Sequence, residues 1–234
     1  MKKYLLIITI LLVVAGCNND LESEGLSRIT YFPDFELEAG DIVLHPLGAE
    51  YAEPGVRVTE EGSEISFTTT GSVDTSTPGF NAIVYSAVNK DGFPGSATRT
   101  VVVVEPDVPS LALEGNYTSN TNAFSGQSLG QKLTVTKLAD GVFASSDSYA
   151  HPSLDIAVRF LINADGTATL ESMPNSPFGI PMNGKITFGV PAGGDVHFPD
   201  GTVQASPVAA DMAFGIILDD DGVPSYQLKT WVKD

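Results

Sequence analysis

The chain has few of the residues that build disulfides, metal centres and basic surfaces. It contains one cysteine, one tryptophan and three histidines in 234 residues, and 12 lysines and arginines against 29 aspartates and glutamates. A single cysteine excludes an internal disulfide. The net charge of −17 creates a field that repels phosphate backbones, so we expect no nucleic-acid partner.

Long segments with a 3.6-residue apolar period are also missing. Apolar and polar residues instead alternate along many short segments, which is the pattern of half-buried β-strands. Asp and Gly tolerate the positive φ of tight hairpin turns, so Asp-Gly pairs between such segments predict hairpins. Five pairs occur, at 91–92, 140–141, 165–166, 200–201 and 221–222. The sequence therefore predicts an all-β fold.

The first sixteen residues have the composition of a secretory signal peptide. Lys2 and Lys3 precede an apolar stretch from Leu5 to Val14, and small residues follow directly before Cys17. The apolar stretch is about ten residues long, whereas a helix that spans a bilayer needs about 20. We therefore expect a cleaved signal rather than a membrane span.

The segment Val14-Ala15-Gly16-Cys17 resembles the lipobox of bacterial lipoproteins. The resemblance implies lipidation at Cys17 and a membrane anchor there. Residues 17–27 read as an acidic tether, and acidic residues behind the cysteine resemble the surface-export signal of Bacteroidetes lipoproteins. This implies attachment to the outer membrane and leaves exposure on the cell surface open.

Two prolines in Glu105-Pro106-Asp107-Val108-Pro109-Ser110 interrupt any strand ladder and stiffen the connection. About 218 mature residues also exceed the usual size of one domain. We predict an N-terminal β-sandwich at 28–106, a linker at 107–113 and a C-terminal antiparallel β domain at 114–234. Strands of the first unit are expected at 29–32, 65–70, 80–88 and 98–105.

The N-terminal unit resembles the bacterial Ig-like domain of surface proteins and of some insecticidal crystal proteins. The motifs that carry the resemblance are Tyr51-x-x-Pro54-Gly55-Val56, Gly71-Ser72-Val73-Asp74-Thr75-x-x-Pro78-Gly79-Phe80, Ile83 to Gly92, and Ala97-Thr98-Arg99-Thr100-Val101. The resemblance implies a sandwich that serves as a spacer or interaction module.

The C-terminal unit has eight or nine candidate strands joined mainly by hairpins, which predicts a closed antiparallel barrel or a second sandwich. Its opening residues, Leu113 to Tyr117, resemble lipocalin-like and Sus-associated domains of Bacteroidetes lipoproteins. We favour the barrel.

Motifs for catalysis and metal binding are weak. Gly126-Gln127-Ser128-Leu129-Gly130 matches the serine-hydrolase pattern, but that pattern needs a strand before the serine and a helix after it, and here a strand follows. His45, His151 and His197 lack metal-ligand spacing, and Asp165-Gly166 lacks the rest of a calcium loop. We expect no catalytic residue, no metal and no cofactor.

Three aromatic residues are candidate ligand contacts: Trp231, Tyr149 and Phe178. If Tyr226, Leu228 and Thr230 face inward, Trp231 stands exposed, where its ring could hold a sugar or a protein partner. The alternative is that Trp231 closes the barrel or meets the first unit. The sequence thus predicts a non-enzymatic surface lipoprotein that binds glycans, or else a structural or protein-interaction lipoprotein without a small ligand.

Overall fold

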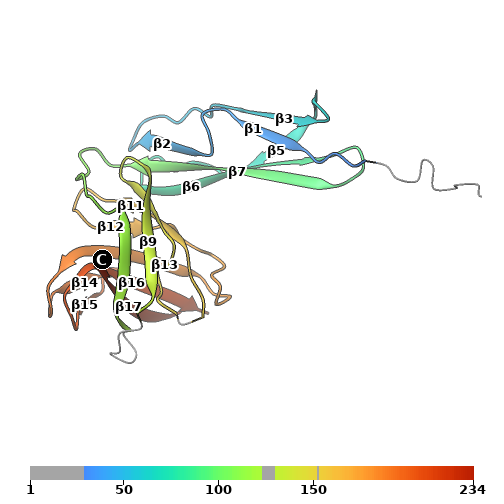
Figure 1. Ribbon diagram of the computed structural model, residues 1–234. Coiled ribbons are helices and arrows are strands. Elements are labelled where there is room, and N and C mark those ends of the chain that lie inside the picture. Colours follow the sequence, from blue (N-terminus) through green and yellow to red (C-terminus); the bar gives the residue numbers. More distant parts are fainter. Residues whose placement is uncertain (1–28, 123–129, 152) are drawn as a thin grey trace, which may run out of the picture.

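The structure, a computed structural model, describes residues 29–122, 130–151 and 153–234. Within these ranges every regular element is a β-strand, which confirms the all-β prediction. The strands build an N-terminal unit of two sheets and a barrel with one outer hairpin (Figure 1). The described ranges accordingly contain no helix that could span a membrane.

The N-terminal unit is a sandwich of a three-stranded and a four-stranded sheet, ordered β1-β3-β4 and β2-β7-β6-β5. Only the β2–β7 pair is parallel. The strands are β1 (Asp34–Leu37), β2 (Ile42–Pro46), β3 (Val56–Glu60), β4 (Ser63–Glu64), β5 (Phe67–Thr70), β6 (Gly79–Val88) and β7 (Pro94–Val104).

Strand β7 is buried on both of its faces. Val101 packs with Ile83 and Tyr85 between the two sheets, whereas Val102 packs outward against Val142 and Leu161 of the barrel. A strand covered on both sides has no polar face to alternate with its apolar one. This double burial explains the uninterrupted run of four valines at the end of β7.

The strand predicted at 29–32 does not form. β1 begins at Asp34, and the preceding residues pair with no strand of the described chain. Pro33 lacks a backbone N–H, and the carbonyl of Tyr31 accepts a hydrogen bond from the side chain of Asn89 at 2.6 Å. The side chains of Ile29 and Phe32 remain exposed.

The barrel consists of eight strands in the closed order β10-β11-β12-β13-β16-β17-β8-β9, each antiparallel to its neighbours. Its strands are β8 (Gly115–Asn122), β9 (Lys132–Ala139), β10 (Val142–Ser145), β11 (Val158–Ile162), β12 (Ala168–Leu170), β13 (Met182–Val190), β16 (Ala210–Asp220) and β17 (Val223–Lys233). A separate hairpin of β14 (Asp195–His197) and β15 (Val203–Ala205) packs on the outside of β16 and β17.

All five predicted Asp-Gly turns join antiparallel partners. Each glycine has a positive φ, between 73° at Gly141 and 88° at Gly201. These turns confirm the hairpins expected from the sequence, because only residues that tolerate this conformation close such short connections.

The interior of the barrel is filled by side chains. One apolar cluster includes Tyr117, Phe143, Phe160, Phe214 and Trp231, all at most 3% exposed. Eight-stranded barrels have an interior that side chains can just fill, so this unit has a packed core.

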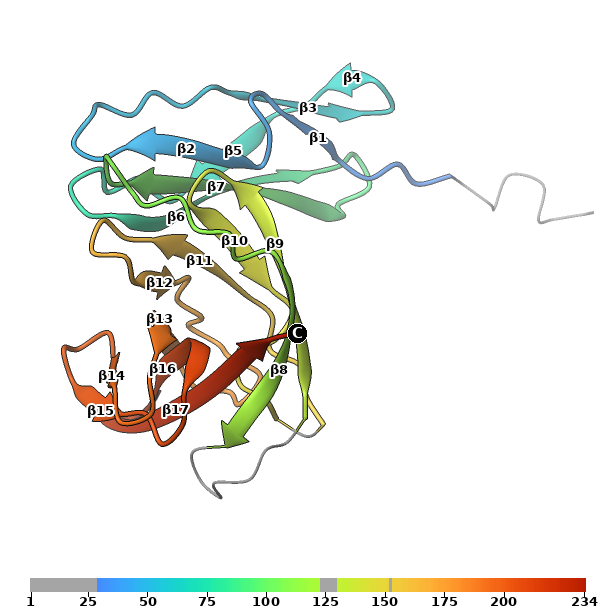
Figure 2. The same cartoon turned by 60° about the vertical axis from the view of Figure 1, so that its left-hand side comes forward.

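The N-terminal unit lies across the outside of the barrel at β10 and β11, and both views show the same arrangement (Figures 1 and 2). Arg159 of β11 donates to Thr100 Oγ1 of β7 at 3.1 Å across this contact. The turn between β6 and β7 lies at the opposite end of the N-terminal unit, beside the first described residues. The linker predicted at 107–113 lies between β7 and β8, but the division into independent domains stays a prediction.

Candidate functional site

The face of β17 that points into the barrel is the one that the sequence-based prediction placed outward. Gln227, Lys229 and Trp231 are 3%, 1% and 0% exposed, and Trp231 belongs to the barrel core. Of the two possibilities left open for Trp231, exposure is therefore wrong, and its packing within the barrel is confirmed. Leu228 on the other face packs under the β14–β15 hairpin, so both faces of β17 are covered.

The inner face of β17 carries polar atoms into the apolar core. Gln227 Oε1 and Trp231 Nε1 are buried without a hydrogen-bond partner among the described residues. A buried donor or acceptor without a partner costs about 1–3 kcal/mol, and buried water or a ligand commonly satisfies such groups. This strand is therefore the part of the barrel wall best suited to meet a polar group.

Lys229 lies between these two residues, and its Nζ is 4.1 Å from the centroid of the Tyr149 ring. Burial lowers the pKa of Lys229 to about 8, although the negative charge of Asp147 raises it. Asp147 is fully buried and accepts hydrogen bonds of 3.0 Å from the backbone N–H groups of Tyr149, Ala150 and Ile156. The lysine thus stands between an aromatic face and a carboxylate held by the backbone.

The rings of Tyr149 and Phe178 meet with centroids 4.8 Å apart, and the His151 ring lies 6.4 Å from that of Phe178. Tyr149 is 8% exposed, whereas Phe178 and His151 are half-buried. We call Tyr149, His151, Phe178 and Lys229 the distal cluster. The structure thus brings two of the predicted ligand residues into direct contact, and Lys229 connects them to the inner face that carries Trp231.

The distal cluster lies at the barrel end that faces away from the N-terminal unit. Tyr149 and His151 come from the β10–β11 connection, and Phe178 comes from the β12–β13 connection. In an antiparallel barrel these connections share one end, and the β11–β12 turn lies at the other. That turn contacts the N-terminal unit, because Glu105 accepts a hydrogen bond from Ala164 N at 2.6 Å.

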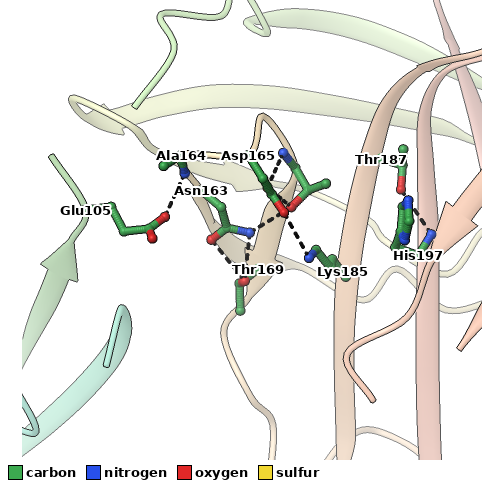
Figure 3. Close-up of polar contacts among 9 residues, drawn as sticks. Glu105, Asn163, Ala164, Asp165, Thr169, Lys185, Thr187 and His197 are labelled. Carbon is green, nitrogen blue, oxygen red and sulfur yellow. Dashed lines mark hydrogen bonds and ion pairs between the residues drawn. The ribbon is translucent and has the colours of Figure 1, made fainter. Parts of the chain in front are cut away.

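A second polar site lies in a groove of about 280 Å³ between the two units (Figure 3). Pro78 and Glu105 line it from one side, and Asn163, Asp165, Thr169 and Lys185 line it from the barrel.

These groove residues mostly bond to one another. Asn163 Nδ2 donates to Thr169 Oγ1 at 3.1 Å, and Lys185 Nζ lies 3.4 Å from Asp165 Oδ2. Although burial raises the pKa of Asp165, hydrogen bonds from Thr167 and the charge of Lys185 hold it below its ordinary value. This network joins the β11–β12 turn to the first unit, and we regard the groove as a structural contact.

Several predicted motifs receive no support as chemical sites. The serine-hydrolase motif around Ser128 and the lipidation residue Cys17 lie outside the described residues. Asp165 in its turn accepts a local hydrogen bond from Thr167 N at 2.9 Å, and Asp219 in the β16–β17 turn accepts one from Gly222 N at 2.9 Å. No group of three or more potential metal ligands occurs among the described residues.

Sequence reasoning missed the buried ionic residues Lys229, Asp147 and Arg99. Lys229 shares one face of β17 with Gln227 and Trp231, and two polar residues on one face resemble the pattern of a solvent-exposed strand face. Arg99 offered a clearer signal, because it occupies the same face of β7 as Ala97 and Val101. A charged residue at a position that points inward indicates a buried ion pair.

Two family models match parts of the chain. Residues 1–18 match the prokaryotic membrane lipoprotein lipid attachment site, and residues 35–103 match the Ig-like domain of bacterial surface proteins. A search of curated proteins found no match.

Two solved structures show limited likeness. The lipoprotein BT2262 from Bacteroides thetaiotaomicron is 24% identical with a TM-score of 0.35, over 87% of this chain and 100% of that one. The M60 catalytic domain with the CBM51-1 and CBM51-2 domains of ZmpB from Clostridium perfringens is 11% identical with a TM-score of 0.30, over 88% of this chain and 22% of that one. Neither value indicates a shared function. From its own matches and strands, the chain is a membrane-anchored lipoprotein with an N-terminal bacterial surface Ig-like domain and an antiparallel β-barrel.

Proposed function

We propose that this lipoprotein is a non-enzymatic glycan-binding protein of the outer membrane, exposed on the cell surface, and that it binds glycans at the distal cluster. The observation that carries the proposal is the contact between Tyr149 and Phe178, whose rings come from two different connections at one end of the barrel. Aromatic rings accept the apolar face of a sugar, and neighbouring polar groups bond its hydroxyls.

The surroundings of these rings suit a sugar. Half-buried His151 lies beside Phe178, whereas Lys229 and Asp147 are buried behind Tyr149. Exposed Asn175 belongs to the same connection as Phe178 and supplies an amide. Recognition of sugars by stacking needs aromatic faces with hydrogen-bonding groups at their edges, and this cluster supplies both kinds of group.

The position of the cluster also suits a surface receptor. The described chain starts at the far end of the N-terminal unit, and the barrel lies at the other end (Figures 1 and 2). An anchor at Cys17 would therefore place the N-terminal unit nearer the membrane and the barrel farther from it. Ligand capture by this arrangement needs no catalytic group.

A glycan-array screen of residues 18–234 tests the proposal, with Phe178→Ala as the variant. Phe67→Ala is the matched control, because Phe67 is a partly exposed phenylalanine of the N-terminal unit. We expect saturable binding that falls about tenfold or more in Phe178→Ala, as loss of one stacking ring and its burial costs about 1.5–3 kcal/mol. The Phe67→Ala control should bind normally.

Trp231→Ala is unsuitable for this screen, because truncating a fully buried tryptophan costs about 3–5 kcal/mol of stability. Emission from Trp231 provides a second readout, since the inner face of β17 that carries this residue also carries Lys229 of the distal cluster. A wild-type chain that binds no glycan, or equal losses in both variants, would contradict the proposal.

The alternative function is that of a structural or protein-interaction lipoprotein. The packed barrel interior favours it, because a core filled by side chains needs no ligand. A flat array would direct the search to protein partners of the same barrel end.

A further inference from the structure

An apolar tip lies at the end of the N-terminal unit farthest from the barrel. Its large side chains are widely exposed: Phe32 is 61% exposed, Phe93 is 47%, and Val88 is 59%. Ile29 and Tyr31, which precede β1, are 71% and 38% exposed. We call these five residues the apolar tip.

The tip is an ordered surface built by a hairpin and the segment before β1. The rings of Phe32 and Phe93 lie 5.8 Å apart. Asn89, which is 5% exposed, holds both parts: its Nδ2 donates to Tyr31 O at 2.6 Å, and its Oδ1 accepts from Phe93 N at 2.7 Å. Part-buried hydrogen bonds therefore hold together the two backbone segments that carry the exposed rings.

A groove of mixed character lies beside the tip at the edge of the sheet, where Ser66, Thr68 and Ser86 accompany its apolar residues. The groove, of about 350 Å³, runs beside Val88 and Pro94 and includes Phe67 of β5, which is 41% exposed. Clustered exposed rings of this kind indicate a surface that something covers.

The lipid anchor limits what lies near this tip. Ile29 follows Cys17 by twelve residues. A fully extended chain of that length spans at most about 40 Å. The chain therefore keeps the apolar tip close to the membrane that holds Cys17, while the barrel lies at the other end of the N-terminal unit (Figure 1).

We propose that the apolar tip inserts into the interface of the membrane that carries the lipid anchor and so holds the protein upright. Phenylalanine, tyrosine and aliphatic side chains are the residues that enter the boundary between headgroups and acyl chains. Tyr31 suits this boundary because its ring is apolar and its hydroxyl is polar.

The charges beside the tip indicate that the contact is apolar. Lys90 lies 3.2 Å from Glu61 and 3.8 Å from Glu60, and Asp91 belongs to the same hairpin turn. One lysine among three carboxylates does not attract an anionic surface. The contact is therefore with the apolar part of the bilayer, and salt leaves it unchanged.

The test places the mature lipidated protein in phosphatidylcholine vesicles and compares two tryptophan substitutions. Phe93→Trp reports on the apolar tip, and Val203→Trp is the matched control on β15, where Val203 is 44% exposed. Phospholipids brominated at different depths quench only a tryptophan that enters the bilayer. The emission of Trp231 in the wild-type protein is subtracted and also reports that each variant is folded.

We expect loss of emission for Phe93→Trp and none for Val203→Trp, with equal quenching at low and high salt. Bromines near the headgroup end of the acyl chain should quench most, because interfacial groups lie about 5–10 Å below the headgroup boundary. No quenching of Phe93→Trp would overturn the proposal and leave a protein partner as the occupant of the tip. Equal quenching of both variants would overturn the upright orientation.

Discussion

The largest fully buried side chain of the N-terminal unit is Arg99, whereas that of the barrel is Trp231. The guanidinium of Arg99 donates to Gly40 O at 3.2 Å, to Gly55 O at 2.9 Å and to Tyr85 Oη at 3.1 Å, and it pairs with the Glu53 carboxylate.

The two units therefore depend on different kinds of interior. In the sandwich, three buried apolar residues form the central cluster: Ile83, Tyr85 and Val101. The hydrogen bonds and the ion pair of Arg99 therefore do much of the work of holding the loops of one sheet to the other sheet. The barrel distributes its stability over a large apolar cluster. We expect the sandwich to be sensitive to a single residue and the barrel to tolerate several small changes.

Arg99→Met should have the largest effect. It leaves several carbonyl groups without their buried partner, and breaking the pair with Glu53 should cost about 3 kcal/mol, the low end for a buried ion pair, because Glu53 is partly exposed. Urea unfolding measured by far-UV circular dichroism should show the sandwich unfolding early. The emission of Trp231 reports on the barrel alone and should keep its midpoint. If the midpoints from circular dichroism and from Trp231 emission both stayed at their wild-type values, Arg99 would not be needed for the stability of the sandwich.

Lys229 should make the barrel more stable as the pH rises from 8 towards 10. Its folded pKa of about 8 lies below the ordinary value of 10.5, so in this range the unfolded chain binds more protons and the free energy of unfolding rises with pH. The rise should total roughly 2 to 3 kcal/mol. Below pH 8 the cost of the buried charge is fully present.

Lys229→Met should lack this rise, and the exposed-lysine control Lys90→Met should keep it. Above pH 10 stability should fall again, because burial raises the pKa of Tyr117 to about 12. Urea titrations followed by Trp231 emission measure both effects. A wild-type stability that is flat from pH 7.5 to 10 would argue against a strongly perturbed lysine.

Leu161→Ala tests whether the two units are coupled. Leu161 faces out of the barrel and packs with Val102 and Val142. The substitution should cost about 2 kcal/mol, at the low end for a buried leucine, because the two units can shift together to fill the space. It should separate the two unfolding transitions. Ile162→Ala, the neighbour that faces the barrel core, should instead lower the barrel transition itself.

Arg159→Lys should have the smallest effect. Arg159 bonds both oxygens of Glu171 and also donates to Thr100 across the contact between the units. Lysine cannot form this forked pair, so the contact should weaken by roughly 1 kcal/mol. Differential scanning calorimetry should show a small separation of the transitions, less than in Leu161→Ala. A larger separation than in Leu161→Ala would mean that polar contacts dominate the interface.

Local chemistry made much of the fold predictable. Asp-Gly pairs located five hairpins because the required backbone conformation depends on those two residues alone. The segment 29–32 has residues of high β-propensity but lacks a partner strand, and Pro33 ends any ladder. The strand predicted there from residue propensity was therefore wrong. The candidate site was half predictable: Tyr149 and Phe178 were identified as aromatic residues in connections, but their contact depends on barrel closure.

The amino-acid sequence by itself determined the lipid attachment site, the all-β class and the turns, because each depends on neighbouring residues. Only the tertiary structure decided which faces are buried. Alternation shows that Leu228 and Trp231 lie on opposite faces of β17, but not that the barrel interior covers one and the β14–β15 hairpin the other. Burial depends on segments far apart in the chain, and no local pattern records which of them will meet.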